Sequence, residues 1–289
     1  MLKIKQYPTG PLSVNTYLVC DDVSKECIII DLGGEIDKIY KDIKEFGGKL
    51  KYILNTHGHF DHIWGEKEAQ EKYNIPIYVH KDDLEMVNNL ETYTKLWGFP
   101  LQSPPKAVCT FDETTNDLTI GDKKIKIFHT PGHTKGGSCF LIENNLFSGD
   151  TLFFNSIGRT DLEGGSYSEL INSIKTKLLP LDENTIVYPG HGPKTTIKNE
   201  LSNVTEIVES FKNENTSFIK DEISNLSSVV ESTNDDISSI SKRTNKLIIL
   251  ADEAQNAYNN NVEKFKNLTS QIIAQINNLT KLGQDFSNI

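Results

Sequence analysis

The sequence predicts a layered α/β domain over residues 1–200, followed by a long helical, coiled-coil extension over residues 201–289. Three observations support this division. Short apolar runs alternate with stretches of helical period in the first part, as in a layered α/β domain. All 10 prolines lie at or before Pro193, and of the 19 glycines only Gly283 lies beyond Gly192. The second part instead repeats apolar residues every 3.5 positions, which predicts a coiled coil.

The first part contains six short apolar runs that suit strands, because β-branched and aromatic residues favour extended backbone. These runs are residues 16–19, 27–30, 52–54, 77–79, 125–128 and 185–188. Two stretches between them place apolar residues on one face of a helix. The first contains Ile36, Ile39, Tyr40, Ile43 and Phe46, and the second contains Leu170, Ile171, Ile174 and Leu178.

The second part follows a heptad frame with Ile219 at position d and Ile223 at position a. Of the 21 a and d positions up to Ile289, 17 are apolar, whereas about eight are expected from an apolar content of 37%. β-branched residues at a and leucines at d favour a parallel dimer. Val229 and Ile248 widen the apolar stripe, which leaves trimers, tetramers and an intramolecular hairpin open. We expect a homo-oligomer formed through this extension.

Composition excludes several classes of function. The 40 acidic residues outnumber the 30 basic ones, and a net charge of −10 argues against a nucleic-acid partner. No apolar run approaches the ~18 residues of a membrane span, and residues 1–11 carry no signal-peptide core. The four cysteines, Cys20, Cys27, Cys109 and Cys139, lack CxxC spacing. We therefore expect reduced cysteines in a cytoplasmic protein with no membrane contact.

The segment Thr56–His62 carries the strongest chemical signal. It reads Thr-His-Gly-His-Phe-Asp-His and places three imidazoles and one carboxylate within six residues. Neutral imidazole and carboxylate are good ligands for Zn²⁺ and Fe²⁺. In an extended segment His57 and His59 point to one side, and Asp61 and His62 then turn toward a second position nearby.

Three further candidates lie far along the chain but in similar local settings. His133 follows the run 124–128, Asp150 follows residues 145–147, and His191 follows the run 185–188. Each has a glycine immediately before it, which lets backbones approach closely. Loops at one edge of a sheet sandwich can converge on a single metal site, so we expect these residues to join the first cluster. His80 and His129 are expected to be a surface histidine and a supporting residue, respectively.

This series of residues, HxHxDH followed by a lone His, an Asp and a last His, resembles the metallo-β-lactamase superfamily. Residues 149–153 (Gly-Asp-Thr-Leu-Phe) and 158–161 (Gly-Arg-Thr-Asp) are similar to those of short hydrolases related to glyoxalase II. The resemblance covers residues 1–200 and implies an αββα sandwich. It also implies a dinuclear site in which His57, His59 and His133 hold metal 1, Asp61, His62 and His191 hold metal 2, and Asp150 bridges them.

The resemblance further implies a thioester hydrolase. Two zinc ions would activate a bridging hydroxide, with iron and manganese as other metals that such donors accept. Asp61 would also orient the nucleophile, and the substrate would be S-acylglutathione or a related small thioester. Arg159 and Lys135 are the candidate residues for binding an anionic substrate. Arg159 has the alternative of holding its own loop through Asp161.

Two alternatives remain from the sequence. In the first alternative the chain is a persulfide dioxygenase, because Gly158–Asp161 also appears in persulfide dioxygenases of the same superfamily, which bind one iron. The absence of a recognisable helical glutathione-binding domain, which the long glyoxalase II enzymes have, leaves this alternative open. In the second alternative, the chain is an oligomeric scaffold whose main function lies in the coiled-coil extension.

Overall fold

The computed structural model describes residues 1–286, and side chains are described except at residues 211–215 and 278–286. The side chains of the expected heptad residues Leu279, Leu282 and Phe286 are therefore not described, and Ile289 lies outside the described residues. The chain divides into two compact units, Met1–Lys212 and Asn213–Ile289. None of the described helices is both long enough and apolar enough to cross a membrane.

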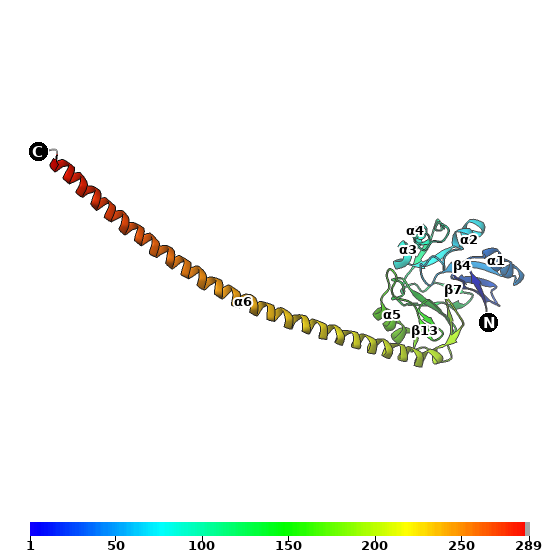
Figure 1. Ribbon diagram of the computed structural model, residues 1–289. Helices are drawn as coiled ribbons and strands as arrows, with labels where there is room; N and C mark the ends of the chain where they lie inside the picture. The colour runs from blue at the N-terminus through cyan, green and yellow to red at the C-terminus, as the bar shows by residue number, and fades with distance from the viewer. Residues whose placement is uncertain (287–289) are drawn as a thin grey trace. The chain divides into compact units, whose positions relative to one another are not determined.

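The first unit, drawn as strands and helices in Figure 1, contains a six-stranded sheet. The strand order of this sheet is β1-β2-β3-β4-β5-β6. Its first three strands pair antiparallel, and β3 to β6 pair in parallel. The strands are β1 (Leu2–Thr9), β2 (Val14–Asp21), β3 (Glu26–Ile30), β4 (Lys49–Leu54), β5 (Ile77–His80) and β6 (Cys109–Phe111).

A five-stranded sheet has the order β15-β14-β11-β10-β9. Its strands are β9 (Lys126–His129), β10 (Ser138–Ile142), β11 (Asn145–Gly149), β14 (Ile186–Pro189) and β15 (Thr195–Thr196). Two small hairpins complete the strands: β7 (Thr119–Ile120) with β8 (Lys123–Lys124), and β12 (Leu152–Phe153) with β13 (Ser156–Ile157).

Helices cover the outer face of each sheet. The helices before the five-stranded sheet are α1 (Ile36–Glu45), α2 (Glu66–Tyr73), the 3₁₀ turn η1 (Lys81–Asp83), α3 (Leu84–Asn88) and α4 (Leu90–Leu96). The later ones are α5 (Tyr167–Ser173), the π-helical turn η2 (Ile174–Leu178) and α6 (Ile197–Phe286). The six expected strands and two expected helices are all present, with ends shifted by a few residues.

Alternation along β2 and β3 explains the layers. Leu18 and Ile29 belong to the cluster that packs under α1, whereas Val19 and Ile28 face the other sheet. Because both faces of these strands are buried, they read as continuous apolar runs. On the far side, Leu170 of α5 and Ile197 at the start of α6 pack with β10, β11 and β14. The first unit therefore has four layers in the order helix, sheet, sheet, helix.

The two sheets meet around Tyr17. Its ring contacts Phe147 edge-to-face at 5.3 Å, and its hydroxyl donates a hydrogen bond to the carbonyl oxygen of Pro189 at 2.7 Å. Asn15 adds a hydrogen bond from its side-chain amide to the same carbonyl at 3.0 Å. These bonds hold the end of β14 against β2 at the sheet edge where the loops converge.

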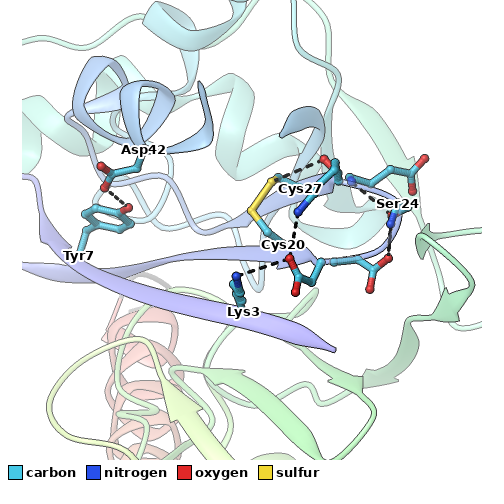
Figure 2. The surroundings of a disulfide bond; sticks show 10 residues. Lys3, Tyr7, Cys20, Ser24, Cys27 and Asp42 are labelled. Atoms are coloured by element: carbon cyan, nitrogen blue, oxygen red, sulfur yellow. Dashed lines mark hydrogen bonds and ion pairs between the residues drawn. A yellow bond between two sulfur atoms is a disulfide. The ribbon is translucent and has the colours of Figure 1, made fainter. Parts of the chain in front are cut away.

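The expectation of four reduced cysteines is wrong. Cys20 of β2 and Cys27 of β3 form a disulfide, as Figure 2 shows. The antiparallel register places these two residues directly opposite each other, so no CxxC spacing is needed. Cys109 and Cys139 are free thiols, exposed and buried respectively. The cysteines therefore no longer support the expectation of a cytoplasmic location.

Helix α6 carries a row of exposed apolar side chains in the second unit. Ile223, Leu226 and Ile240 are each about 60% exposed. The expected a and d residues from Ile219 to Gln275 are thus on the helix surface. The helix itself runs without a break to Phe286 (Figure 1). Such a helix cannot bury its apolar stripe within itself.

Candidate metal centre

Loops at the ends of four strands bring the predicted ligands together. The segment 57–62 follows β4, His133 follows β9, Asp150 follows β11, and His191 follows β14. All seven predicted metal ligands lie in three overlapping groups, in each of which the ligand atoms are within 4.8 Å of one another. The structure thus brings together residues that are up to 134 positions apart in the chain.

Three imidazoles form the first group. The ring centroids of His57, His59 and His133 are 4.6 to 4.8 Å apart, with interplanar angles of 76° to 84°. Rings that stand nearly perpendicular to one another can all direct a nitrogen lone pair at one point. This arrangement supplies three of the four ligands of a tetrahedral ion and leaves one position for water or substrate.

Asp61, His62 and His191 form another group beside the first. The Nε2 atom of His191 lies 3.2 Å from Oδ2 of Asp61, and Nε2 of His62 lies 3.7 Å from the same oxygen. These residues come from two different sheets, so the group exists only where the sheet edges meet.

Asp150 stands between the two groups. Its Oδ1 lies 3.4 Å from Nε2 of His62, and its Oδ2 lies 3.6 Å from Nε2 of His133 and 3.7 Å from Nε2 of His191. The carboxylate therefore lies within 3.7 Å of imidazole nitrogens of both groups, and its Oδ2 alone approaches one nitrogen of each.

The hydrogen bonds of the imidazoles test whether metal ions fit. The Nε2 atoms of His57, His62 and His133 are buried and have no hydrogen-bond partner, although buried polar atoms are normally paired. Their Nδ1 atoms do have partners: Thr56 Oγ1 at 3.0 Å, Asp31 Oδ2 at 2.9 Å and the carbonyl oxygen of Arg159 at 2.7 Å, respectively. An acceptor at Nδ1 keeps the proton there and leaves the Nε2 lone pair free for a metal.

Asp31 serves both groups. Its carboxylate accepts hydrogen bonds from Nδ1 of His62 and from the backbone N–H and hydroxyl of Thr56, which in turn holds His57. The residue adopts a left-handed conformation with φ of 55° at the end of β3. Such a conformation is uncommon for residues other than glycine, although aspartate is among those that adopt it more readily.

Asp83 is a further supporting residue that the sequence reasoning missed. Its Oδ2 accepts hydrogen bonds from the Gly58 N–H at 2.9 Å and the Thr134 hydroxyl at 2.7 Å, and its Oδ1 accepts one from the Gly136 N–H at 2.6 Å. It therefore joins the loop of His57 and His59 to the loop of His133. The only sequence signal was an acidic pair after β5, which by itself reads as an exposed turn.

Glycine is required beside the ligands, as expected. A Cβ atom at Gly190 would lie 2.3 Å from Oδ1 of Asp150 and 2.7 Å from Cε1 of His62. At Gly149 it would lie 2.2 Å from Oγ1 of Thr56, where φ is also positive at 49°. Neither position has room for a side chain.

Burial and crowding set the charges of these groups. Burial, reinforced by nearby imidazoles, lowers the pKa of His57 and brings that of His59 to about 3. Burial opposes charge on His62 too, but the carboxylates of Asp61, Asp150 and Asp31 raise its pKa well above the ordinary value. Burial likewise opposes ionisation of Asp150, yet the imidazoles around it lower its pKa. Without metal, the centre thus combines neutral imidazoles at His57 and His59 with a protonated His62 and ionised Asp150. His62 must lose its proton before it can bind a metal.

A cavity of about 250 Å³ opens onto this centre. Arg159 lines it and forms a bidentate ion pair with Asp161 at 2.7 Å, the contact expected if Arg159 holds its own loop. Lys135 lies elsewhere, on a neighbouring hollow that it shares with the acidic residues Asp82 and Glu85.

A fourth group, His80, Glu113 and His129, stands apart from the centre. His80 is fully buried, so the expectation of a surface histidine is wrong: β5 ends inside the sandwich. The rings of His80 and His129 stack at 4.2 Å with an interplanar angle of 13°. Because a metal lies in the plane of each imidazole ligand, two nearly parallel rings cannot share an ion in this arrangement.

A two-sheet sandwich whose loops gather five imidazoles and two carboxylates at one edge defines a class of metal-binding α/β proteins. The chain belongs to the metallo-beta-lactamase superfamily, whose profile matches residues 9–191, and it is a metallo-hydrolase of that superfamily. All of helix α6 lies outside the matched residues.

Relatives match the first part of the chain over nearly their whole length. The "Probable metallo-hydrolase YqgX" of Bacillus subtilis is 39% identical over 204 residues, which are 69% of this chain and 94% of that protein. "Hydroxyacylglutathione hydrolase GloC" of Haemophilus influenzae is 34% identical over 202 residues, covering 69% and 95%. The crystal structure of TTHA1623 in a di-iron-bound form is 33% identical, with a TM-score of 0.61, and covers 68% and 96%.

Proposed function

We propose that this protein is a dinuclear metal-dependent hydrolase that cleaves a thioester. In this proposal His57, His59 and His133 hold one ion, Asp61, His62 and His191 hold the other, and Asp150 bridges them. The observation that carries the proposal is the set of buried, unpaired Nε2 atoms that face one another across Asp150.

Two divalent cations, when bound, supply Lewis-acid activation of water and of the substrate carbonyl. The rest of the work falls to residues of this chain. Asp31 and the carbonyl of Arg159 hold the imidazoles in one tautomer, and Asp83 holds the two ligand loops together. The carboxylate of Asp61 orients the attacking water. A thiolate is a good leaving group, so the reaction does not need a separate strong general acid.

Two comparisons support a thioester substrate and a two-metal site. The GloC relative is named as a hydroxyacylglutathione hydrolase, and TTHA1623 was solved in a di-iron-bound form. Histidine and aspartate donors accept zinc, iron and manganese. We propose zinc as the resident metal, with two ions per chain.

We also propose that residues 1–200 are the catalytic domain and that residues 201–289 form a homo-oligomer through a coiled coil. The exposed a and d residues of α6, among them Ile223, Leu226, Ile237 and Ile240, support this proposal. Apolar side chains at these positions gain most from burial against a second copy of the same helix.

The test is metal content by elemental mass spectrometry on protein produced without added metal, followed by hydrolysis of S-acyl thioesters. We expect about two ions per chain, in line with a two-metal site, and metal-dependent thiol release. In Asp150→Asn the binding of both ions should be weakened. The matched control Asp161→Asn should bind both ions as the wild type does. One iron per chain together with oxygen uptake on glutathione persulfide would contradict the proposal and favour a persulfide dioxygenase.

A further inference from the structure

The cavity at the candidate metal centre is lined by two chemically different sets of side chains. One set consists of the predicted ligands His59, Asp61, His133, Asp150 and His191. The other set, the apolar wall, consists of Leu12, Phe60, Met86, Leu96, Trp97 and Leu162, and Tyr93, Arg159 and Glu163 complete the lining. A group bound at the metals therefore has an apolar surface directly beside it.

Phe60 belongs to the apolar wall and is a chain neighbour of two predicted ligands. It stands in the chain between His59 and Asp61, one proposed ligand of each ion, and is 6% exposed. Its ring lies 6.4 Å from that of Trp97 and 5.2 Å from that of Phe99. Aromatic contacts at these distances are favourable, so packing against Trp97 and Phe99 stabilises the position of the Phe60 ring.

Three large apolar side chains that line this cavity are exposed to solvent. Leu96 is 76% exposed, Leu12 45% and Trp97 44%. All three come from loops or helix ends around the same opening. Apolar side chains gathered at a cavity mouth are typical of a binding site for an apolar group.

Charged groups on the lining are already paired. Arg159 is the cation among the described lining residues apart from the histidines, and Asp161 neutralises it through two hydrogen bonds of 2.7 Å. The carboxylate of Glu163 accepts a hydrogen bond from the Tyr93 hydroxyl at 2.9 Å. The cavity thus offers one neutralised cation to a substrate, which does not match a carrier with several carboxylates.

From this geometry we infer that the cavity holds the acyl group of the substrate and that this group is apolar, a short alkyl chain or a single aromatic ring. The inference rests on the proposed thioester hydrolase and narrows its substrate class. The volume of about 250 Å³ lies below the ~300–1,000 Å³ of sites for drug-sized ligands, which suits a group of this size. The carbonyl carbon faces the metals, and the thiol carrier extends toward solvent.

The test uses the metal-loaded full chain and thioesters of one small neutral thiol, N-acetylcysteamine, with acetyl, butyryl, hexanoyl and benzoyl groups. We expect kcat/KM to rise about fourfold for each methylene that enters the cavity, as burial of a methylene predicts. A second series keeps the acetyl group and varies the thiol from N-acetylcysteamine to glutathione. We expect this series to change kcat/KM less than threefold.

Trp97→Ala removes the largest side chain of the apolar wall. We expect it to lower kcat/KM about tenfold for the hexanoyl substrate and less than twofold for the acetyl substrate. The matched control is Leu101→Ala, a nearby side chain that is 67% exposed and outside the cavity lining. It should leave both values unchanged, and circular dichroism together with the metal content checks that the Trp97 variant is folded.

Binding of the product carboxylates gives a readout that does not depend on turnover. In calorimetry we expect hexanoate to bind the metal-loaded protein at least tenfold more tightly than acetate, and Trp97→Ala to remove this difference. Equal rates for all acyl groups, or a preference set by the thiol, would overturn the inference while leaving the hydrolase intact. If no thioester is cleaved, the proposed function fails, and the calorimetric comparison still decides whether the cavity prefers an apolar group.

Discussion

The carboxylate of Asp83 accepts a hydrogen bond of 2.9 Å from the backbone N–H of Gly58. Gly58 separates His57 from His59, and the same carboxylate also binds Thr134 and Gly136, which follow His133. One side chain thus holds two ligand loops that come from different sheets. It touches neither a metal ligand's imidazole nor the cavity near Arg159, so we regard it as a positioning residue.

Asp83→Asn should weaken metal binding while preserving the fold. The amide of asparagine keeps one acceptor oxygen but cannot accept all three hydrogen bonds. Loss of such support typically lowers metal affinity or activity about 10- to 100-fold. We expect a shift of this size in chelator competition, with kcat reduced when metal is limiting and largely restored at saturating metal. Asp82→Asn, next to it and exposed, is the matched control; an equal effect in both variants would argue against a specific role.

Metal binding should release a proton near neutral pH. Burial disfavours the charged form of His62, but the carboxylates of Asp61, Asp150 and Asp31 raise its pKa well above 6.5, so its imidazole is protonated in the metal-free protein. A metal displaces that proton. Apparent metal affinity should therefore fall as pH decreases below the raised pKa, by up to about tenfold per pH unit. Proton release can be measured by titration in weakly buffered solution, and pH-independent affinity between pH 6 and 8 would contradict this assignment.

Reduction of the Cys20–Cys27 disulfide should lower stability. The bond closes a short loop between β2 and β3, and the loop-entropy relation predicts about 2–3 kcal/mol for a loop of this size. We expect urea unfolding to show this difference between oxidised and reduced protein. The double variant Cys20→Ala/Cys27→Ala should no longer respond to reductant, whereas Cys109→Ser should respond like the wild type. Four titratable thiols in unfolded, unreduced protein would show that the bond does not form.

Arg159 and Lys135 should differ in their contribution to activity. Arg159 lines the cavity, where its guanidinium lies 5.9 Å from the ring centroid of Trp97. We expect Arg159→Ala to lower kcat/KM several-fold through KM. Lys135 faces a neighbouring acidic hollow, so Lys135→Ala should leave kcat/KM within about twofold. A large rise in KM for Lys135→Ala would instead support the substrate-binding role that the sequence suggested.

Oligomerisation and catalysis should separate at the boundary between the two compact units. A chain ending at Lys212 should stay folded, bind metal and keep its activity but be monomeric in light scattering. In the full chain, Ile237→Asp at position a should dissociate the oligomer, because a carboxylate at the core of a coiled coil is unfavourable. Ser239→Asp, on the outer face of the heptad, is the matched control. If light scattering shows that the unmodified full chain is a monomer, the coiled-coil proposal is wrong.

Six of the strands and the seven candidate ligands were predictable because their signals are local. The run Cys27–Ile30 reads as a buried strand from its side chains alone, and His57 to His62 crowd ligand atoms within one loop. The glycines before His133, Asp150 and His191 mark places where backbones approach. Each of these signals lies within a few neighbouring residues of the sequence.

The sequence by itself determined six of the strands, two helices of the first part, the candidate ligands and the heptad of α6. Tertiary structure alone decided which residues meet across the two sheets. The bond from Asp83 to Gly136, the disulfide between Cys20 and Cys27, and the burial of His80 all depend on strand register and sheet packing. Nothing local in the chain encodes these distances, because a contact between distant segments exists only once the backbone between them has folded.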